Sequence, residues 1–302
     1  GAGYIGAHVA RDLLASGREV VILDDLSTGL RARVPEEATF VEASLLDTDA
    51  VRHALDGVTG VVHLAAKKAV GESVEQPLLY YRENVGGMTS LLQAMADAAT
   101  PCIVHSSSAA VYGEPPWSPI SEDSPLAPLS PYGETKVIGE WMVRDEAIAR
   151  ADSTPLSWVS LRYFNVAGAG SPDLGDTSVN NLIPMVFAAL DRGEAPRVFG
   201  TDYPTFDGSC VRDYIHVSDL AAAHVAAADL AERGDAADVF NVGTGVGSSV
   251  HEVMAAVSDV VGRDVGAVAV PRRAGDPPEL VASVDRISAE LGWSAQRDLR
   301  DM

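Results

Sequence analysis

The chain has 302 residues, 47% of them hydrophobic, and a formal net charge of −21 at pH 7. So large an acidic excess argues against nucleic acid as a partner, because that affinity depends on lysines and arginines that neutralise phosphates. The sequence contains no apolar run of membrane-spanning length and no zinc-type Cys/His spacing, so we expect neither a membrane nor a metal as partner. Cys102 and Cys210 are the only cysteines, which indicates a reducing compartment and predicts a cytoplasmic location.

Over the first 158 residues, short apolar runs alternate with helical segments, which is typical of a parallel sheet covered by helices. The first helix is expected over residues 4–16, because Ile5, Val9 and Leu13 recur at four-residue intervals. Strands are expected at residues 19–23, 39–42, 60–64, 102–105 and 158–161.

After residue 168 the sequence changes to loops rich in Gly, Pro, Asp and Asn, with helices expected at 182–192, 217–233 and 249–261. We therefore predict an α/β fold with a doubly wound (Rossmann) parallel sheet in a first domain, residues 1–168. Residues 169–302 are expected to form a smaller, mainly substrate-binding region, with some segments returning to the first domain.

Three glycines form a turn at the mouth of the first helix. Gly1, Gly3 and Gly6 spell G-x-G-x-x-G, and backbone N–H groups and the helix dipole can receive a pyrophosphate there. The apolar strand that follows ends in Asp24, about 20 residues on, where an acidic group binds the ribose hydroxyls of adenosine. A carboxylate at that place repels a 2′-phosphate. The pattern therefore predicts NAD rather than NADP as the cofactor.

The glycine turn also opens the printed sequence. In the strand order 3-2-1-4-5-6 the strand before this turn is central, and without it two neighbours would leave unpaired backbone groups in the core, each costing about 1–3 kcal/mol. We therefore expect the sequence to be a fragment of a longer chain, with an apolar strand and a Thr-Gly turn ahead of Gly1 and a short extension after Met302.

The strand expected at 60–64 runs into Ala65 and Ala66, whose small side chains would let a cofactor lie against the strand end. Lys67 and Lys68 follow as possible phosphate partners, and the choice between them stays open. Asn84 either hydrogen-bonds the cofactor or caps the helical stretch that begins there.

Tyr132 and Lys136 have the Y-x-x-x-K spacing that puts both side chains on one face of a helix. A phenol has a pKa of about 10, and an adjacent ammonium stabilises its phenolate, so we expect the pKa of Tyr132 to be lowered. Tyr132 would then be a general acid/base for a hydroxyl group.

Ser108 closes the serine triplet after the strand expected at 102–105, at the edge where open α/β sheets place ligands. We expect Ser108 to hydrogen-bond the reacting hydroxyl and relay its proton to Tyr132.

Further motifs accompany these features along essentially the whole chain. They are Gly-Tyr-Ile-Gly (3–6), Leu-Asp-Asp-Leu-Ser (23–27), Ala-Val-Gly-Glu-Ser (69–73), Ser-Ser-Ser-Ala-Ala-Val-Tyr-Gly (106–113), Ser-Pro-Tyr-Gly (130–133), Leu-Arg-Tyr-Phe-Asn-Val-Ala-Gly-Ala (161–169), Asn-Asn-Leu-Ile-Pro (180–184), Val-Arg-Asp-Tyr-Ile-His-Val (211–217) and Phe-Asn-Val-Gly-Thr-Gly (240–245). With them the chain resembles the extended short-chain dehydrogenase/reductase family and, within it, the nucleotide-sugar 4-epimerases of the UDP-galactose type.

This resemblance implies an isomerase that uses NAD to epimerise C4 of a UDP-hexose through a 4-keto intermediate, and it suggests a homodimer. The catalytic residues would be Tyr132, Lys136 and Ser108. For NAD the resemblance implies Gly3, Tyr4, Ile5, Gly6, Asp24, Asp25, Ser27, Ser44, Leu45, Leu64, Ala65, Ala66, Lys68, Asn84, Ser106, Tyr132, Lys136 and Phe164. For the UDP-sugar it implies Ser108, Tyr132, Asn165, Asn181, Leu182, Val198, Phe199, Arg212, Arg273 and Asp276.

The sequence departs from that family at two places beside the cofactor. Ser44 stands where the family usually has an aspartate for the adenine amino group, and Lys67 replaces a more usual apolar residue. Epimerases of UDP-N-acetylglucosamine, UDP-glucuronate or UDP-xylose remain alternatives, as does a non-catalytic NAD-binding regulator. A sugar-nucleotide 4,6-dehydratase is disfavoured, because Ala109 and Ala110 stand where related enzymes carry carboxylates.

Overall fold

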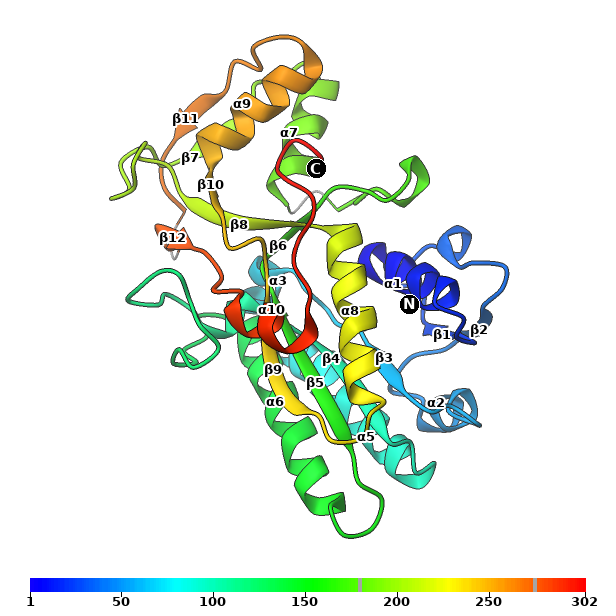
Figure 1. Cartoon of the computed structure of the whole chain (residues 1–302). Coiled ribbons are helices and arrows are strands. Elements are labelled where there is room, and N and C mark those ends of the chain that lie inside the picture. The colour runs from blue at the N-terminus through cyan, green and yellow to red at the C-terminus, as the bar shows by residue number, and fades with distance from the viewer. Residues whose placement is uncertain (179–180, 274–275) are drawn as a thin grey trace.

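The computed structural model describes residues 1–178, 181–273 and 276–302, and its centre is a four-stranded parallel sheet in the order β3-β4-β5-β9 (Figure 1). The strands are β3 (Val61–His63), β4 (Cys102–Ser108), β5 (Ser157–Tyr163) and β9 (Ala237–Val242). All residues of β4 and β5 except the last of each are buried. Burial on both faces explains why these strands show no alternation of apolar and polar residues.

Two further parallel strands form a separate small sheet. These are β1 (Val21–Asp24) and β2 (Thr39–Glu42), with Val21 opposite Thr39 and Asp24 opposite Glu42. The loops that follow both strands lie at the same edge, because parallel strands run in the same direction. This edge brings together side chains that are 20 residues apart in the sequence.

Helices cover both faces of the central sheet. On one face lie α1 (Tyr4–Ala15) and α8 (Val217–Ala231), where Leu220 packs with Val104 and Leu161 of the sheet. On the other face lie α2 (Thr48–Ala54), α5 (Gly87–Asp97) and α6 (Pro131–Arg150). Parallel strands with helices on both faces are the doubly wound α/β arrangement expected from the sequence.

Short helical segments connect these elements. They are α3 (Val70–Glu75), α4 (Pro77–Tyr80), the π-helix η2 (Tyr81–Gly86) and the 3₁₀ turns η1 (Arg31–Arg33), η3 (Ala109–Val111) and η4 (Pro172–Leu174). The π-helix joins α4 directly to α5, so the chain is continuously helical from Pro77 to Asp97. A π-helix has wider turns than an α-helix and is frequent at functional sites.

A second region lies above the sheet in Figure 1. Its strands are β6 (Asn165–Ala167), β7 (Arg197–Phe199), β8 (Val211–His216), β10 (Gly247–Ser249), β11 (Val268–Val270) and β12 (Glu279–Leu280). Strand β8 pairs with β6, β10 and β12, whereas β7 pairs with β11. Helices α7 (Leu182–Asp191) and α9 (Val250–Val261) pack on these strands through a cluster that includes Val186 and Val253.

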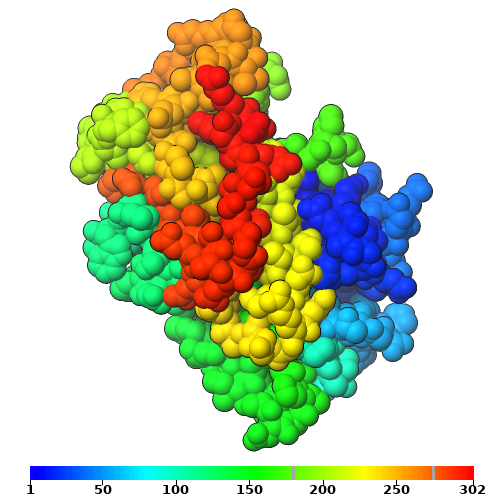
Figure 2. Space-filling model, viewed as in Figure 1, coloured from blue at the N-terminus to red at the C-terminus, as the bar shows by residue number. Residues whose placement is uncertain are grey.

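Hydrogen bonds connect the two regions. The Tyr4 hydroxyl donates to the Gly168 carbonyl at 2.6 Å, and Nε2 of His8 accepts the N–H of Gly170 at 2.9 Å. After α10 (Asp285–Leu291) the C-terminal segment runs across the front of the molecule beside α8 (Figure 2). Along it, Trp293 donates to the carbonyl of Asp219 at 3.2 Å.

The expected elements are all observed to within a few residues, but strands β6 to β12, among them β9 of the central sheet, were not expected from the sequence. Strand β2 has the expected limits, but β4 continues through Ser108, three residues beyond the expected end. The extension forms because residues 106–108 pair with residues 161–163 of β5. Among the helices of residues 1–178, 181–273 and 276–302, none is long and apolar enough to cross a bilayer.

Candidate active site

The glycine turn before α1 leaves an open surface at the helix N-terminus. A Cβ atom on Gly3 would meet nothing within 4 Å, whereas one on Gly6 would lie 2.6 Å from the carbonyl oxygen of Gly1. Gly3 is the N-cap residue of α1, and no side chain caps the helix there. Tight packing at Gly6 and open backbone at Gly3 are what a pyrophosphate at a helix N-terminus requires.

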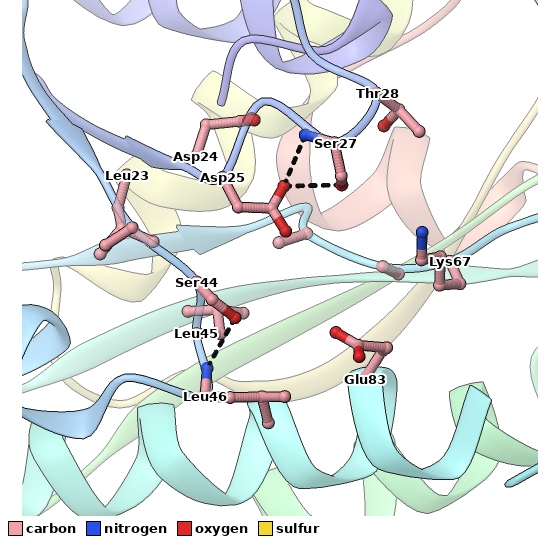
Figure 3. Close-up of a pocket in the computed structure, with 13 residues that line it drawn as sticks. Leu23, Asp24, Asp25, Ser27, Thr28, Ser44, Leu45, Leu46, Lys67 and Glu83 are labelled. Atoms are coloured by element: carbon pink, nitrogen blue, oxygen red, sulfur yellow. Dashed lines mark hydrogen bonds between the residues drawn. The ribbon is translucent and has the colours of Figure 1, made fainter. Parts of the chain in front are cut away.

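A pocket lies next to this turn, at the ends of β1, β2 and β3 (Figure 3). It is lined by Leu23, Asp24, Asp25, Ser27, Thr28, Ala43, Ser44, Leu45, Leu46, Ala65, Ala66, Lys67 and Glu83. The Asp24 carboxylate is held in place by the N–H groups of Ala2 at 2.8 Å and Leu26 at 2.9 Å. A fixed carboxylate with apolar walls beside it fits the adenosine half of a dinucleotide.

Seven of the residues predicted to bind NAD line this pocket together. They are Asp24, Asp25, Ser27, Ser44, Leu45, Ala65 and Ala66. Leu64 is half-buried and does not belong to the lining. Of the two adjacent lysines, Lys67 lines the pocket, whereas Lys68 is exposed outside it. Glu83 was not predicted to bind NAD, because no neighbouring residue indicates which way a π-helix turns its side chains.

Asn84 is buried and makes three hydrogen bonds within the protein. Its Oδ1 accepts the backbone N–H of Lys67 at 2.8 Å, and its Nδ2 donates to the Lys67 carbonyl and to Thr135 Oγ1, both at 3.0 Å. Both ends of the amide are therefore used to hold the loop after β3 against α6. In this structure Asn84 shapes the cofactor pocket by positioning Lys67.

Tyr132 and Lys136 lie one turn apart near the start of α6. The helix begins cleanly because Ser130 caps it, its Oγ accepting the N–H of Gly133 at 3.3 Å, and Pro131 occupies the first turn. Lys136 Nζ donates to the Ser106 carbonyl at 2.7 Å and lies 5.9 Å from the centre of the Tyr132 ring. The two side chains are 8% and 5% exposed, so their charges are poorly screened.

Burial dominates the ionisation of both groups. It raises the pKa of Tyr132, although a hydrogen bond with Ser108 lowers it in part. It also lowers the pKa of Lys136 to about 8, opposed by the negative charge of Glu140. The lowered pKa expected for Tyr132 is therefore not observed in the protein alone. The physical reason is that the Lys136 ammonium points at the Ser106 carbonyl, while the phenol loses water on all sides.

Two serines of β4 have different surroundings. Ser108 ends the strand, accepts the N–H of Ala110 at 3.2 Å and lies near enough to the Tyr132 hydroxyl to lower the pKa of that phenol in part. Ser106 Oγ instead lies 3.0 Å from Nε2 of His224 on α8, on the opposite side of the sheet from α6. Ser106 reaches the Tyr–Lys pair only through its carbonyl oxygen. Ser108 is thus the serine whose hydroxyl faces the reacting centre.

On the substrate side, the structure brings four predicted residues together. Asp276 lies between two arginines, with 3.6 Å from its Oδ1 to Arg212 Nη2 and 3.7 Å from its Oδ2 to Arg273 Nε. The Arg273 guanidinium stacks 4.1 Å above the centre of the Phe199 ring. Neither ion pair has the short bidentate geometry of a structural pair, so both guanidinium groups remain available for phosphate oxygens.

The remaining predicted residues are more dispersed. Phe164 is buried with Tyr112 and Val137, and Asn165 begins β6 with an exposed side chain. Asn181 is the N-cap residue of α7, but its side chain makes no capping bond and donates instead to Asp176 at 2.7 Å; Leu182 is the first residue of that helix. Val198 is 2% exposed in the core of the second region. Asn180, part of the motif at 180–184, lies outside the described residues.

Residues 1–243 match the model of the NAD dependent epimerase/dehydratase family. The chain is 44% identical to the UDP-glucose 4-epimerase of Azospirillum brasilense over 100% of its own length and 87% of that protein's. It is 45% identical to the enzyme of the same name from Bacillus subtilis, over 100% and 92% of the two chains.

Solved structures agree with these matches. A UDP-glucose 4-epimerase from Stenotrophomonas maltophila, with bound NAD and formylated UDP-arabinopyranose, superposes with a TM-score of 0.94 at 39% identity, over 100% of this chain and 93% of that one. A UDP-glucose 4-epimerase from Bifidobacterium longum in complex with NAD⁺ and UDP gives 0.89 at 35% identity, over 100% and 93%. These matches cover the segments that carry the dinucleotide turn, the adenosine pocket and the Tyr–Lys pair. The chain therefore belongs to the NAD dependent epimerase/dehydratase family, among its UDP-glucose 4-epimerases.

Proposed function

We propose that this chain catalyses the NAD-dependent epimerisation of a UDP-hexose at C4, interconverting UDP-glucose and UDP-galactose through a transient 4-keto intermediate. The observation that carries the proposal is the convergence of Tyr132, Lys136 and Ser108 at the end of β4, on the sheet edge where the dinucleotide turn also lies. The names of the full-length relatives support the same activity.

When bound, NAD supplies a nicotinamide ring that takes a hydride from C4 of the sugar and returns it, and the positive charge of the oxidised ring favours ionisation of a nearby phenol. Tyr132 accepts the proton of the 4-hydroxyl group as the C4–H bond breaks, and Ser108 hydrogen-bonds the same oxygen. Lys136 favours the phenolate by its charge. After the keto sugar has rotated so that its other face is presented, Tyr132 returns the proton while hydride is added to that face of C4.

Product analysis tests this function directly. The purified protein is incubated separately with UDP-glucose, UDP-galactose and UDP-N-acetylglucosamine, and the products are identified by chromatography and NMR. We expect UDP-glucose and UDP-galactose to interconvert without added reductant. Recovery of unchanged substrate, or of a dehydrated sugar, would contradict the proposal. UDP-N-acetylglucosamine belongs in the panel because a solved relative from Campylobacter jejuni, 37% identical, is described as a UDP-Glc/GlcNAc 4-epimerase.

Arg212 provides a test of the substrate side. Its side chain is only 12% exposed and lies 3.6 Å from Asp276, so its charge is partly desolvated. Arg212→Ala is expected to weaken UDP binding by roughly 2 kcal/mol, the size of a lost charge-assisted hydrogen bond, and to leave bound NAD unchanged. Calorimetric titration with UDP and measurement of bound NAD check both parts. Loss of both ligands to the same extent would mean that Arg212 acts by holding β8 in place.

The exposed apolar side chains of α3, α4 and α6 support a homodimer. Trp141 and Ile148, seven residues apart on one face of α6, are 48% and 68% exposed, and Val74 and Leu78 nearby are 61% and 80% exposed. Several large apolar side chains exposed on helices that contact one another indicate a partner surface. We expect light scattering to give twice the monomer mass for the native protein and the monomer mass for Trp141→Asp. A monomeric native protein would contradict this assembly.

The state of the cysteines supports a cytoplasmic location. Cys102 and Cys210 are both free and buried. Burial raises the pKa of the Cys102 thiol to about 11, so it stays protonated at neutral pH. Two unpaired thiols are typical of proteins kept in a reducing compartment. Fractionation of the producing cells tests the location.

A further inference from the structure

The adenine base has one place to lie if the dinucleotide binds as the glycine turn and Asp24 indicate. With the pyrophosphate at the N-terminus of α1 and the ribose at Asp24, the base extends into the pocket beyond Asp24 (Figure 3). One wall of this part consists of residues 44–46, and the other of residues 65–67. Adenine carries an exocyclic amino group, and burying such a donor without an acceptor is unfavourable.

Ser44 is poorly suited to be that acceptor. Its Oγ already accepts the N–H of Leu46 at 3.1 Å, so only one of its two lone pairs is left, and as a neutral hydroxyl it is a weaker acceptor than a carboxylate. The two aspartates of the pocket are held by the glycine turn and the loop that follows β1, Asp24 through both of its oxygens and Asp25 through Oδ1. Asp24 accepts the N–H groups of Ala2 and Leu26, and Oδ1 of Asp25 accepts both the N–H and the hydroxyl of Ser27 at 2.9 and 2.7 Å. Both aspartates therefore belong to the loop that surrounds the ribose.

Glu83 is the remaining carboxylate of the pocket lining. It lies on the π-helix η2, and its side chain is 21% exposed. Its Oε1 pairs with the neighbouring Arg82 at 2.6 Å, and that arginine is 65% exposed. Figure 3 shows the Glu83 carboxylate rising from the helix at the floor of the pocket, across from Ser44 and below Lys67. Oε2 is thus free to accept a hydrogen bond from within the pocket.

The π-helix explains how Glu83 comes to face the pocket. The next residue, Asn84, is fixed in the other direction by its hydrogen bonds to Lys67 and Thr135. Asn84 thereby sets the position of the Lys67 backbone, while Glu83 presents its carboxylate beneath the Lys67 side chain.

We propose that the Glu83 carboxylate accepts a hydrogen bond from the exocyclic amino group of adenine. This contact would make the pocket selective for adenine over a 6-oxopurine. It would take the part that the resemblance gives to an aspartate at position 44. The inference rests on the proposed function only in requiring NAD as the cofactor. It assigns Glu83 as a specificity-determining residue of the cofactor site.

The test compares NAD with nicotinamide hypoxanthine dinucleotide, which has a 6-oxo group in place of the amino group and carries a hydrogen on N1. A carboxylate attracts the amino group and repels the oxo group. The protein is equilibrated with equal excess concentrations of both dinucleotides, starting from either one, until the bound ratio is constant. The protein is then denatured and the released dinucleotides are counted by chromatography. We expect at least tenfold more NAD than the hypoxanthine analogue, a difference of about 1.4 kcal/mol.

Two variants separate selectivity from structure. Glu83→Ala is expected to lower the ratio at least fivefold, and Glu83→Gln should bring it near one, because an amide can present either its oxygen or its NH₂ group. Glu75→Ala is the matched control, since it removes the same charge from an exposed position of α3 outside the pocket, and its ratio should equal that of the native protein.

Some outcomes would overturn the proposal. A native ratio near one would show that no acceptor meets the amino group. An unchanged ratio in both Glu83 variants would place the base elsewhere, and equal weakening of both dinucleotides would make Glu83 structural. None of these outcomes affects the epimerase assignment, which depends on sugar products. If neither dinucleotide were recovered from the native protein, both the role of Glu83 and the epimerase assignment would be overturned.

Discussion

Replacing Tyr132 by phenylalanine is expected to lower the turnover of UDP-galactose by about 10²- to 10⁴-fold, the usual contribution of a general acid/base. The ring is 8% exposed, so phenylalanine keeps its packing and removes only the hydroxyl that Ser108 bonds. The fold and the amount of bound NAD should therefore stay as in the native protein. Steady-state kinetics with UDP-galactose, together with the absorbance of released NAD, measure the two effects.

A second tyrosine provides the control for this substitution. Tyr81 also carries a hydroxyl hydrogen-bonded to a neighbouring side chain, Glu134, but it lies on η2 outside the reacting centre. Tyr81→Phe should keep turnover within about twofold of the native value, because the hydrogen bond that it removes goes to Glu134 and not to the reacting centre. If Tyr132→Phe behaved like Tyr81→Phe, another group would have to carry the proton.

Replacing Lys136 by alanine is expected to lower turnover and to move the acidic limb of the pH profile upward by about one to three pH units. The direction follows from charge: an ammonium favours the Tyr132 phenolate, so its removal raises the pKa of that phenol. In the native protein the ammonium itself is lost as the pH rises through about 8, the lowered pKa of Lys136. Its support of the phenolate is thus complete only below that pH.

The pH dependence of kcat/KM for the native protein, Lys136→Ala and Lys136→Arg tests this role. Arginine keeps the positive charge at all pH values used, so Lys136→Arg should show the acidic limb near its native position. Alanine also leaves the Ser106 carbonyl without its 2.7 Å donor, and a melting curve for each variant checks that loss of structure is not the cause. An acidic limb that stays in place in Lys136→Ala would assign the lysine to binding alone.

Much of the fold could be predicted because local patterns and tertiary structure agree. The helix expected over 4–16 is observed as α1, Tyr4–Ala15, since its apolar spacing matches the face that packs on the sheet. The order of glycine turn, acidic strand end, serine triplet and Tyr–Lys pair was the basis for predicting a dinucleotide site with a catalytic pair. Each of these signals is read over a few adjacent residues.

The remaining features depend on contacts between distant segments. The direction of Ser106 toward His224 is set by α8, 118 residues away in the sequence. The raised pKa of Tyr132 comes from burial by its surroundings, which the spacing to Lys136 does not report. The orientation of Glu83 requires a π-helix, whose extra residue per turn has no known signature in this sequence.

The pairing of β9 with β5 has a consequence for how the protein can be divided. Strand β9 and helix α8 come from the second half of the sequence, yet they cover the edge and one face of the sheet formed by the first half. A protease that cut once in the loop after β6 would therefore not release a compact cofactor-binding fragment. The two pieces would stay associated through Leu161, Leu220 and Phe240, and they would lose their structure in a single step.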